Sequence, residues 1–187
     1  SDVCSSDLNY LVKTSKTRNI DGIIHMAAQS GGVAFSNEKP ATLLTKNVEM
    51  CINIIESAIQ IGCSRIILVL STACYDPNIV NPNEDQILDG KLLGNDYSYA
   101  YAKRLMVPMM WAFNKQYNLN ISCVVVNGIV GPNMNYIEGQ STLVASQIKK
   151  FYAARNNQQQ IEVWGDGSPL REYSYSYDLA KIGRAHV

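Results

Sequence analysis

Tyr99 and Lys103 stand four residues apart in a stretch that the sequence predicts to be helical, so both side chains lie on one helix face. A free tyrosine has a pKa of about 10, and a neighbouring ammonium group favours the phenolate and lowers that pKa. Such a pair can move a proton to or from a carbonyl group. The spacing alone would more often mark two unrelated surface residues. Its place after a strand that ends in hydroxyl residues, and after a long loop, favours chemistry.

The hydroxyl residues are Ser71 and Thr72, which follow an apolar run at residues 65–70. A hydroxyl there can hold a substrate carbonyl oxygen and stabilise developing charge. On its own, Ser-Thr after a strand is ordinary turn chemistry. Next to Tyr99 and Lys103 it completes a candidate triad.

The elements that must position these residues alternate between strands and helices. Apolar runs predict strands at residues 23–26, 65–70 and 121–126, and helical spacing predicts helices from Pro40 to about Gly62 and over residues 97–117. This alternation predicts an α/β fold with right-handed crossovers and a parallel sheet covered by helices on both faces. Ligands in that architecture bind beyond the carboxyl ends of the strands. The small, polar or glycine-rich segments expected there are residues 27–32, 71–76 and 127–133.

After Gly131 the pattern changes to a polar loop, a helix around residues 143–155 and a strand at residues 161–164, so we expect a change of domain near Gly131. We expect both chain ends to be artefacts, at residues 1–8 and 182–187. Residues 2–7 can be encoded by DNA whose reverse complement encodes residues 182–187, and that DNA resembles a sequencing adapter.

Composition excludes several classes of protein. With 47% hydrophobic residues and a formal net charge of +0, the chain is typical of a soluble globular protein and does not indicate a nucleic-acid partner. No apolar run is long enough for a membrane helix. Outside the end segments the cysteines have no C-x-x-C spacing, so we expect no metal site and a reduced, cytoplasmic protein.

Five motifs, in order along the chain, resemble those of the GDP-L-fucose synthases, a family of extended short-chain dehydrogenase/reductases. They are residues 25–32 (His-Met-Ala-Ala-Gln-Ser-Gly-Gly), 71–77 (Ser-Thr-Ala-Cys-Tyr-Asp-Pro), 97–104 (Tyr-Ser-Tyr-Ala-Tyr-Ala-Lys-Arg), 131–133 (Gly-Pro-Asn) and 163–172 (Val-Trp-Gly-Asp-Gly-Ser-Pro-Leu-Arg-Glu). The resemblance implies conversion of GDP-4-keto-6-deoxymannose to GDP-fucose, by epimerisation at two carbons and reduction with NADPH, with NAD not excluded.

The resemblance also implies a fold and a set of partners. Residues 9–130 would form a Rossmann-like, doubly wound NAD(P)-binding domain that lacks its first βα unit and the glycine-rich turn for the cofactor pyrophosphate. Residues 131–181 would begin a smaller substrate-binding domain. A GDP-sugar substrate and a homodimer are expected by analogy.

The resemblance assigns catalytic roles residue by residue. Tyr99 would be the catalytic acid, and Lys103 would support it and hold the nicotinamide ribose. Counting back from Pro77 makes Thr72 the hydroxyl and Cys74 the base of the epimerisation, whereas counting forward makes Ser71 the hydroxyl; we favour Thr72. A modest downward shift of its pKa would suit Cys74 as a base, although a small buried side chain is an equally good interpretation.

One expected residue is absent, and the binding residues follow from the same comparison. The family has a histidine acid near the position of Thr142, where this chain has none, which puts the epimerisation in doubt. Expected cofactor contacts are Ala27, Ala28, Gln29, Asn47, Lys103 and Asn127. Expected substrate contacts are Asn133, Lys150, Trp164 and Arg171. For Lys150 and Trp164, a surface lysine and a core tryptophan are nearly equal alternatives.

Two other classes of function compete. One is another nucleotide-sugar 4-epimerase or 4,6-dehydratase; the dehydratase is weakened because Ala73 and Cys74, not acidic residues, follow Thr72. The other is a non-catalytic sugar-nucleotide-binding relative. The intact Tyr99 and Lys103 argue against it, and the missing histidine argues for it.

Overall fold

The chain forms two compact units, residues 1–126 and residues 127–187, in a computed structural model. The structure describes residues 12–13, 15–16, 19–30, 33–92, 94, 97–137, 141–155, 160–163, 165–168 and 170–185.

The first unit is built on a parallel sheet of three strands in the order β1-β2-β3. The strands are β1 (Ile23–His25), β2 (Arg65–Ser71) and β3 (Asn120–Val126). Helix α3 (Pro40–Ile61) connects β1 to β2, and α4 (Tyr97–Tyr117) connects β2 to β3. The predicted alternation of strands and helices is therefore confirmed. A short helix that the sequence did not predict, α2 (Val33–Glu38), precedes α3.

Helix α3 begins and ends where its sequence dictates. Pro40 occupies the first turn, where a missing N–H costs no hydrogen bond. Gly62 ends the helix in the left-handed conformation, with φ of 72°, and its N–H donates to the carbonyl of Ile59. These two residues set the predicted bounds, and both are found.

The core lies between the sheet and the pair α3 and α4. Alternate residues of β2 point into it, so that Ile66, Leu68 and Leu70 are at most 1% exposed. They pack in one cluster with residues of both helices, among them Cys51, Ile55, Met106 and Val107.

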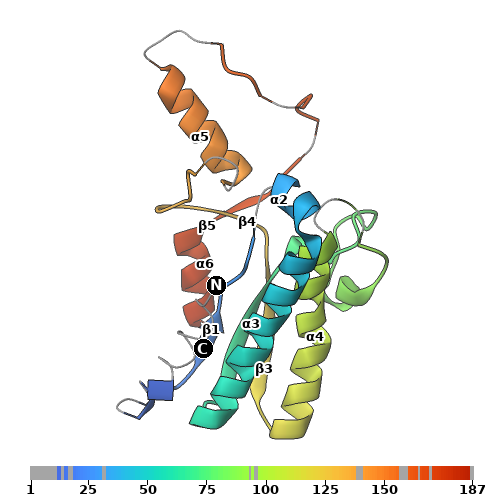
Figure 1. The fold of residues 1–187 in the computed structure, drawn as a ribbon, viewed down its shortest axis with the longest axis vertical. Helices are drawn as coiled ribbons and strands as arrows, with labels where there is room; N and C mark the ends of the chain where they lie inside the picture. Colours follow the sequence, from blue (N-terminus) through green and yellow to red (C-terminus); the bar gives the residue numbers. More distant parts are fainter. Residues whose placement is uncertain are drawn as a thin grey trace. The chain divides into compact units, whose positions relative to one another are not determined.

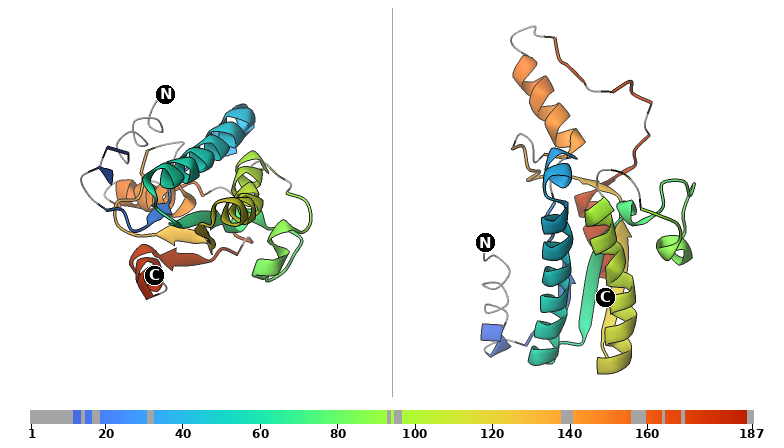
Figure 2. Two further views of the ribbon diagram at one scale, coloured as in Figure 1. Left: turned by 90° about the horizontal axis from the view of Figure 1, so that it is seen from below. Right: turned by 45° about the vertical axis from the view of Figure 1, so that its right-hand side comes forward.

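Helices α3 and α4 lie side by side on the same face of this sheet (Figure 1, Figure 2). The predicted α/β fold with a parallel sheet is confirmed, and within the described part of this unit α3 and α4 cover one face of the sheet. The physical reason is the strand order: successive right-handed crossovers that advance in one direction place their helices on one face. On the other face Ile24 and Val124 are 61% and 40% exposed.

The predicted loop after β2 contains two short 3-10 helices, η1 (Thr72–Cys74) and η2 (Glu84–Leu88). Asn83 caps η2 because its Oδ1 accepts the N–H of Asp85, and Oε1 of Gln86 accepts the N–H of Asn83. Ile87 is buried, so this part of the loop has its own anchor in the core.

The second unit pairs β4 (Gly128–Val130) with β5 (Tyr173–Tyr175) in parallel. Its helices are α5 (Leu143–Ala154), as predicted, and α6 (Ser176–Ala185), which includes residues 182–185 of the expected artefact. A Cβ atom on Gly128 would lie 2.7 Å from the ring of Tyr173, so a larger residue there would require that ring to shift.

The strand predicted at residues 161–164 is wrong over its described part, because residues 161–163 form no strand. Alternating apolar side chains, such as Ile161 and Val163, do not make a strand without a partner, and the partner of β4 is β5 instead. Trp164 lies outside the described residues. Among the helices that the structure describes, none has the length and apolar character needed to cross a membrane.

Candidate active site

The carboxyl end of β2 and the first turns of α4 bring together the residues predicted to do chemistry. Lys103 is 2% exposed, and its Nζ lies 5.9 Å from the centre of the Tyr99 ring. The same Nζ donates a hydrogen bond of 2.9 Å to the backbone carbonyl of Val69, near the end of β2. The helix spacing therefore places the ammonium group against both the strand and the tyrosine.

Lys103 is held in an environment that opposes its charge. Burial lowers its pKa, while the thiols of Cys51 and Cys74 raise it. No carboxylate forms an ion pair with it within the described residues. A buried ammonium without a counterion is costly, and such groups are concentrated at functional sites.

The two candidate hydroxyls have different environments. Ser71 is partly buried, and its Oγ accepts the N–H of Ala73 at 3.2 Å, which caps η1. Its hydroxyl hydrogen is still available to a substrate oxygen. Thr72 is exposed. Both residues stand next to the Val69 carbonyl that Lys103 holds, and neither is singled out by geometry.

Cys74 is completely buried and belongs to the hydrophobic core cluster. Burial raises the pKa of its thiol, and the N–H of Ser71 and the charges of Arg104 and Lys103 only partly oppose that rise. The direction is opposite to the downward shift that would suit a base. The structure therefore agrees with the alternative interpretation of Cys74 as a small buried side chain.

The segment after β1 has the character of a surface for a flat ligand. Ala27 and Gln29 are exposed, Ala28 is half-buried, and the alanines carry no bulk beyond Cβ. Small residues allow another molecule to approach the backbone closely, as a dinucleotide would require.

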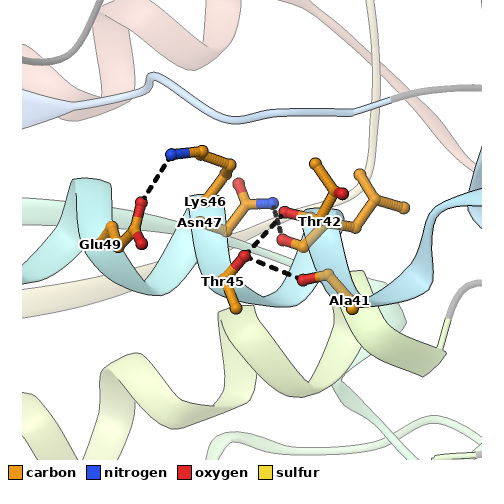
Figure 3. Close-up of polar contacts among 7 residues, drawn as sticks. Ala41, Thr42, Thr45, Lys46, Asn47 and Glu49 are labelled. Atoms are coloured by element: carbon orange, nitrogen blue, oxygen red, sulfur yellow. Dashed lines mark hydrogen bonds and ion pairs between the residues drawn. The ribbon is translucent and has the colours of Figure 1, made fainter. Parts of the chain in front are cut away.

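Asn47, whose place on helix α3 is shown in Figure 3, holds this segment through hydrogen bonds to Gln29. It is 1% exposed, and its Oδ1 accepts the N–H of Gln29 at 3.0 Å. Its Nδ2 donates to the carbonyls of Gln29 and Leu43, at 2.9 and 2.7 Å. Both amide hydrogens are thus used within the protein. Asn47 acts on the predicted cofactor surface by fixing Gln29.

Two buried polar residues near the site were missed as functional candidates. His25 is 4% exposed, and its Nε2 has no hydrogen-bond partner in the described part of the chain. Burial, assisted by the charge of Lys103, lowers the pKa of His25 to about 4. Arg104 is 6% exposed and donates to backbone carbonyls. For His25 the available signal was a polar residue within the apolar run that forms β1.

Three of the predicted substrate residues, Asn133, Lys150 and Arg171, belong to the described part of the second unit. Lys150 donates from Nζ to the carbonyl of Glu162 at 2.9 Å, which ties α5 to the segment after it. Arg171 is exposed, and its Nη1 donates to the carbonyl of Leu170. Asn133 is exposed with φ of 65°.

Asn127, a surface hollow and the possibility of a metal site concern parts of the chain outside the Tyr99–Lys103 region. Asn127, a predicted cofactor contact, is half-buried at the start of the second unit. A shallow hollow lined by Gly62 and Tyr117 lies at the far ends of α3 and α4, away from the strand ends. No group of three or more His, Cys, Asp or Glu side chains suited to a metal ion occurs among the described residues.

Comparison with known proteins places this arrangement in a family. The model of the NAD dependent epimerase/dehydratase family matches residues 2–185. The GDP-L-fucose synthase of Dictyostelium discoideum is 32% identical over 178 residues, which are 94% of this chain and 54% of that protein. The GDP-L-fucose synthase of Escherichia coli strain K12 is 28% identical over 167 residues, 88% of this chain and 52% of that protein.

A solved structure agrees with these relatives. The GDP-L-fucose synthetase of Naegleria fowleri bound to NADP superposes with a TM-score of 0.83 at 26% identity, covering 97% of this chain and 60% of that one. The chain spans about half the length of the curated relatives it matches. On its sequence match and its parallel α/β fold, this chain belongs to the NAD dependent epimerase/dehydratase family.

Proposed function

We propose that this chain carries part of the active site of a nucleotide-sugar oxidoreductase, which reduces a GDP-linked 4-keto-6-deoxy sugar with NADPH. The observation that carries the proposal is the buried Lys103, held on the Val69 carbonyl with its ammonium group 5.9 Å from the Tyr99 ring centre. The substrate class is supported by the relatives, which are named GDP-L-fucose synthases.

In this proposal, residues of this chain donate the proton and stabilise the charge that remains. The phenol of Tyr99 gives its proton to the carbonyl oxygen of the sugar, and the nearby ammonium of Lys103 stabilises the phenolate that remains. Thr72 or Ser71 donates a hydrogen bond to the same oxygen and fixes its position. The bound NADPH supplies the hydride that reduces the carbonyl carbon.

The residues after β1 fit a nicotinamide dinucleotide. Ala27 and Ala28 leave the backbone open to close approach, and Asn47 holds Gln29 in place beneath it. We propose that Ala27, Ala28 and Gln29 contact the cofactor together with Lys103, and that Asn47 acts through Gln29. Asn127 stays a proposed cofactor contact on the family resemblance. NADP is favoured over NAD because the Naegleria relative is described with NADP bound.

For the substrate side, we propose Asn133, Lys150, Trp164 and Arg171 as contacts of the GDP-sugar. Arg171 is the best supported, because its guanidinium is exposed and a planar fork matches the oxygens of a diphosphate. Lys150 already donates to the Glu162 carbonyl, so its contribution would come from its charge.

The 3,5-epimerisation is a second candidate activity. The charges of Arg104 and Lys103 lie close enough to Cys74 to lower its pKa and so favour the thiolate. Burial acts in the opposite direction and is the larger effect. Simple reduction of the 4-ketone is therefore the favoured activity.

We propose that the protein is a cytoplasmic homodimer that pairs through α4. Tyr97, Tyr101 and Leu105 follow one another at intervals of four residues on this helix, and each is 42% or more exposed. An apolar stripe of this kind on a surface helix marks an interaction site. Leu105→Glu should shift the protein from dimer to monomer in light scattering, and a persisting dimer would exclude this interface.

The test of function uses the protein that contains this chain, with GDP-4-keto-6-deoxymannose and NADPH in heavy water. We expect loss of NADPH absorbance, and Tyr99→Phe should slow it by at least about a hundredfold, the scale of general acid catalysis. Unchanged reduction by Tyr99→Phe would refute the assignment.

The deuterium content of the product separates the remaining candidates. Deuterium at C3 and C5 would add the epimerisation to the proposed activity. Reduction without deuterium would leave a simple 4-ketoreductase. No oxidation of NADPH would favour a 4-epimerase or 4,6-dehydratase for another sugar nucleotide, or a non-catalytic sugar-nucleotide-binding protein.

A further inference from the structure

Arg104 follows Lys103 on α4 and is buried, with 6% of its surface exposed. It makes no ion pair among the described residues. Its Nε donates to the carbonyl of Cys74 at 2.7 Å, and its Nη1 donates to the carbonyl of Gly90 at 3.1 Å. Arginine is seldom buried without partners. Besides the two carbonyls, Arg104 has the Tyr101 ring, with its centre 6.0 Å from Cζ, and the charge of Asp76, whose pKa Arg104 helps to lower.

The two carbonyls lie at the two ends of a loop formed by residues 75–91, here called the 75–91 loop. Cys74 directly precedes it and Gly90 is near its end, and the place where the two ends meet is called its neck. Asp76 closes the same neck, because its carboxylate accepts the N–H of Lys91 at 2.8 Å. Gly90 has φ of 64°, and a Cβ atom there would collide with the Asp76 carboxylate. The neck therefore depends on a glycine, a carboxylate and a buried guanidinium.

Two successive cations of α4 hold one short stretch of chain. Lys103 donates to the carbonyl of Val69, and Arg104 donates to the carbonyl of Cys74. The residues between those carbonyls include both candidate hydroxyls. We propose that Arg104 is a positioning residue that fixes residues 70–73 and the neck of the 75–91 loop against the helix that carries Tyr99. Its effect on catalysis rests on the proposed function, whereas the fixation of the loop does not.

A guanidinium group suits this role better than an ammonium group would. Its N–H donors are fixed in one plane, so that one side chain reaches the Cys74 and Gly90 carbonyls together. A lysine at this position would keep the charge, but all its donors lie on one nitrogen, so it lacks the two separate nitrogens, Nε and Nη1, with which Arg104 reaches the two carbonyls. The charge also opposes the rise in the pKa of Cys74 that burial causes.

The first test measures amide hydrogen exchange by mass spectrometry in the protein that contains this chain. Arg104→Met should speed exchange at least tenfold in peptides that cover residues 70–91, and Arg104→Lys should have a smaller effect. Peptides of α3 serve as the internal reference. Lys115→Met, at an exposed position in the last turn of the same helix, is the matched control and should change nothing. Unchanged exchange in a folded Arg104→Met protein would overturn the proposal.

The second test separates positioning from simple stability. With GDP-4-keto-6-deoxymannose, Arg104→Met should lower kcat at least tenfold and leave the KM for NADPH within about twofold, because Arg104 holds the hydroxyl segment and not the segment after β1. A raised KM for NADPH with unchanged kcat would overturn this role. If Arg104→Met does not fold, Arg104→Lys decides by the same two readouts. If the parent protein reduces no keto sugar but Arg104→Met still speeds hydrogen exchange in the 75–91 loop, the proposed function is refuted. The role of Arg104 in fixing the loop is then still supported.

Discussion

His25 should make the stability of this protein depend on pH in a way that can be measured. Burial and the charge of Lys103 lower its pKa from 6.5 to about 4 in the folded chain, whereas in the unfolded chain it titrates near 6.5. Between these values the unfolded state binds more protons than the folded state. The free energy of unfolding must therefore fall as the pH falls from 6.5 to 4, and below 4 the contribution is constant.

The size of the effect follows from the same two values. The difference between 6.5 and about 4, at about 1.4 kcal/mol for each pH unit, corresponds to about 3 kcal/mol. This is a large fraction of the stability of a small domain, which is about 5 to 15 kcal/mol. It is an upper value, because local opening that admits water to the imidazole reduces it.

Urea unfolding between pH 4 and pH 7.5 measures the effect, with His25→Gln as the test variant. Carboxylates titrate in both proteins and cancel in the difference. The stability of the parent relative to His25→Gln should drop by up to about 3 kcal/mol between pH 7 and pH 4. Parallel curves for the parent and His25→Gln would show that His25 is not held neutral by burial.

Three further predictions follow from the same unit. Asn47→Leu removes the hydrogen bonds to Gln29, so it should lower the free energy of unfolding in urea by about 1 to 3 kcal/mol. It should also weaken NADPH binding without a matching loss of kcat, and unchanged binding would contradict this. Gly90→Ala should cost at least about 1 kcal/mol more than Gly62→Ala, because both positions have positive φ but only a Cβ at residue 90 meets a carboxylate; equal costs would refute the steric reason. Lys103→Met should abolish ketone reduction yet raise the free energy of unfolding near neutral pH, because a buried charge is removed. This gain should shrink as the pH rises toward 10.5, because the parent then loses its buried charge. A loss of stability at neutral pH would mean that the hydrogen bond to the Val69 carbonyl outweighs the cost of burial.

Local sequence signals predicted the first unit well. Continuous apolar runs gave β1, β2 and β3, and Pro40 and Gly62 gave the bounds of α3, because strand hydrophobicity and helix capping depend on neighbouring residues. The second unit was harder. The strand expected at residues 161–164 is not formed over residues 161–163, and β4 and β5 were missed because a three-residue strand exists only through its distant partner.

The sequence predicted the residues that could do chemistry but not the buried residues that hold them in place. The four-residue spacing placed Tyr99 and Lys103 on one face, which the structure reproduces. Nothing in the local pattern says that Asn47 or Arg104 is buried, because their burial depends on carbonyls far along the chain. The burial of Cys74 could not be read from its spacing either, and it reverses the expected direction of its pKa shift.

Helix α4 carries the candidate catalytic residues and also the contacts that fix their position. Successive residues of an α-helix point about 100° apart, so Lys103 and Arg104 diverge from neighbouring positions. One reaches the Val69 carbonyl, and the other reaches the carbonyls of Cys74 and Gly90. The rotation of α4 about its axis is thereby fixed by two independent contacts on the strand-end segment, and the same rotation sets where Tyr99 points. A change that turned the helix would break both contacts together, so the direction of the tyrosine is coupled to the closure of the loop.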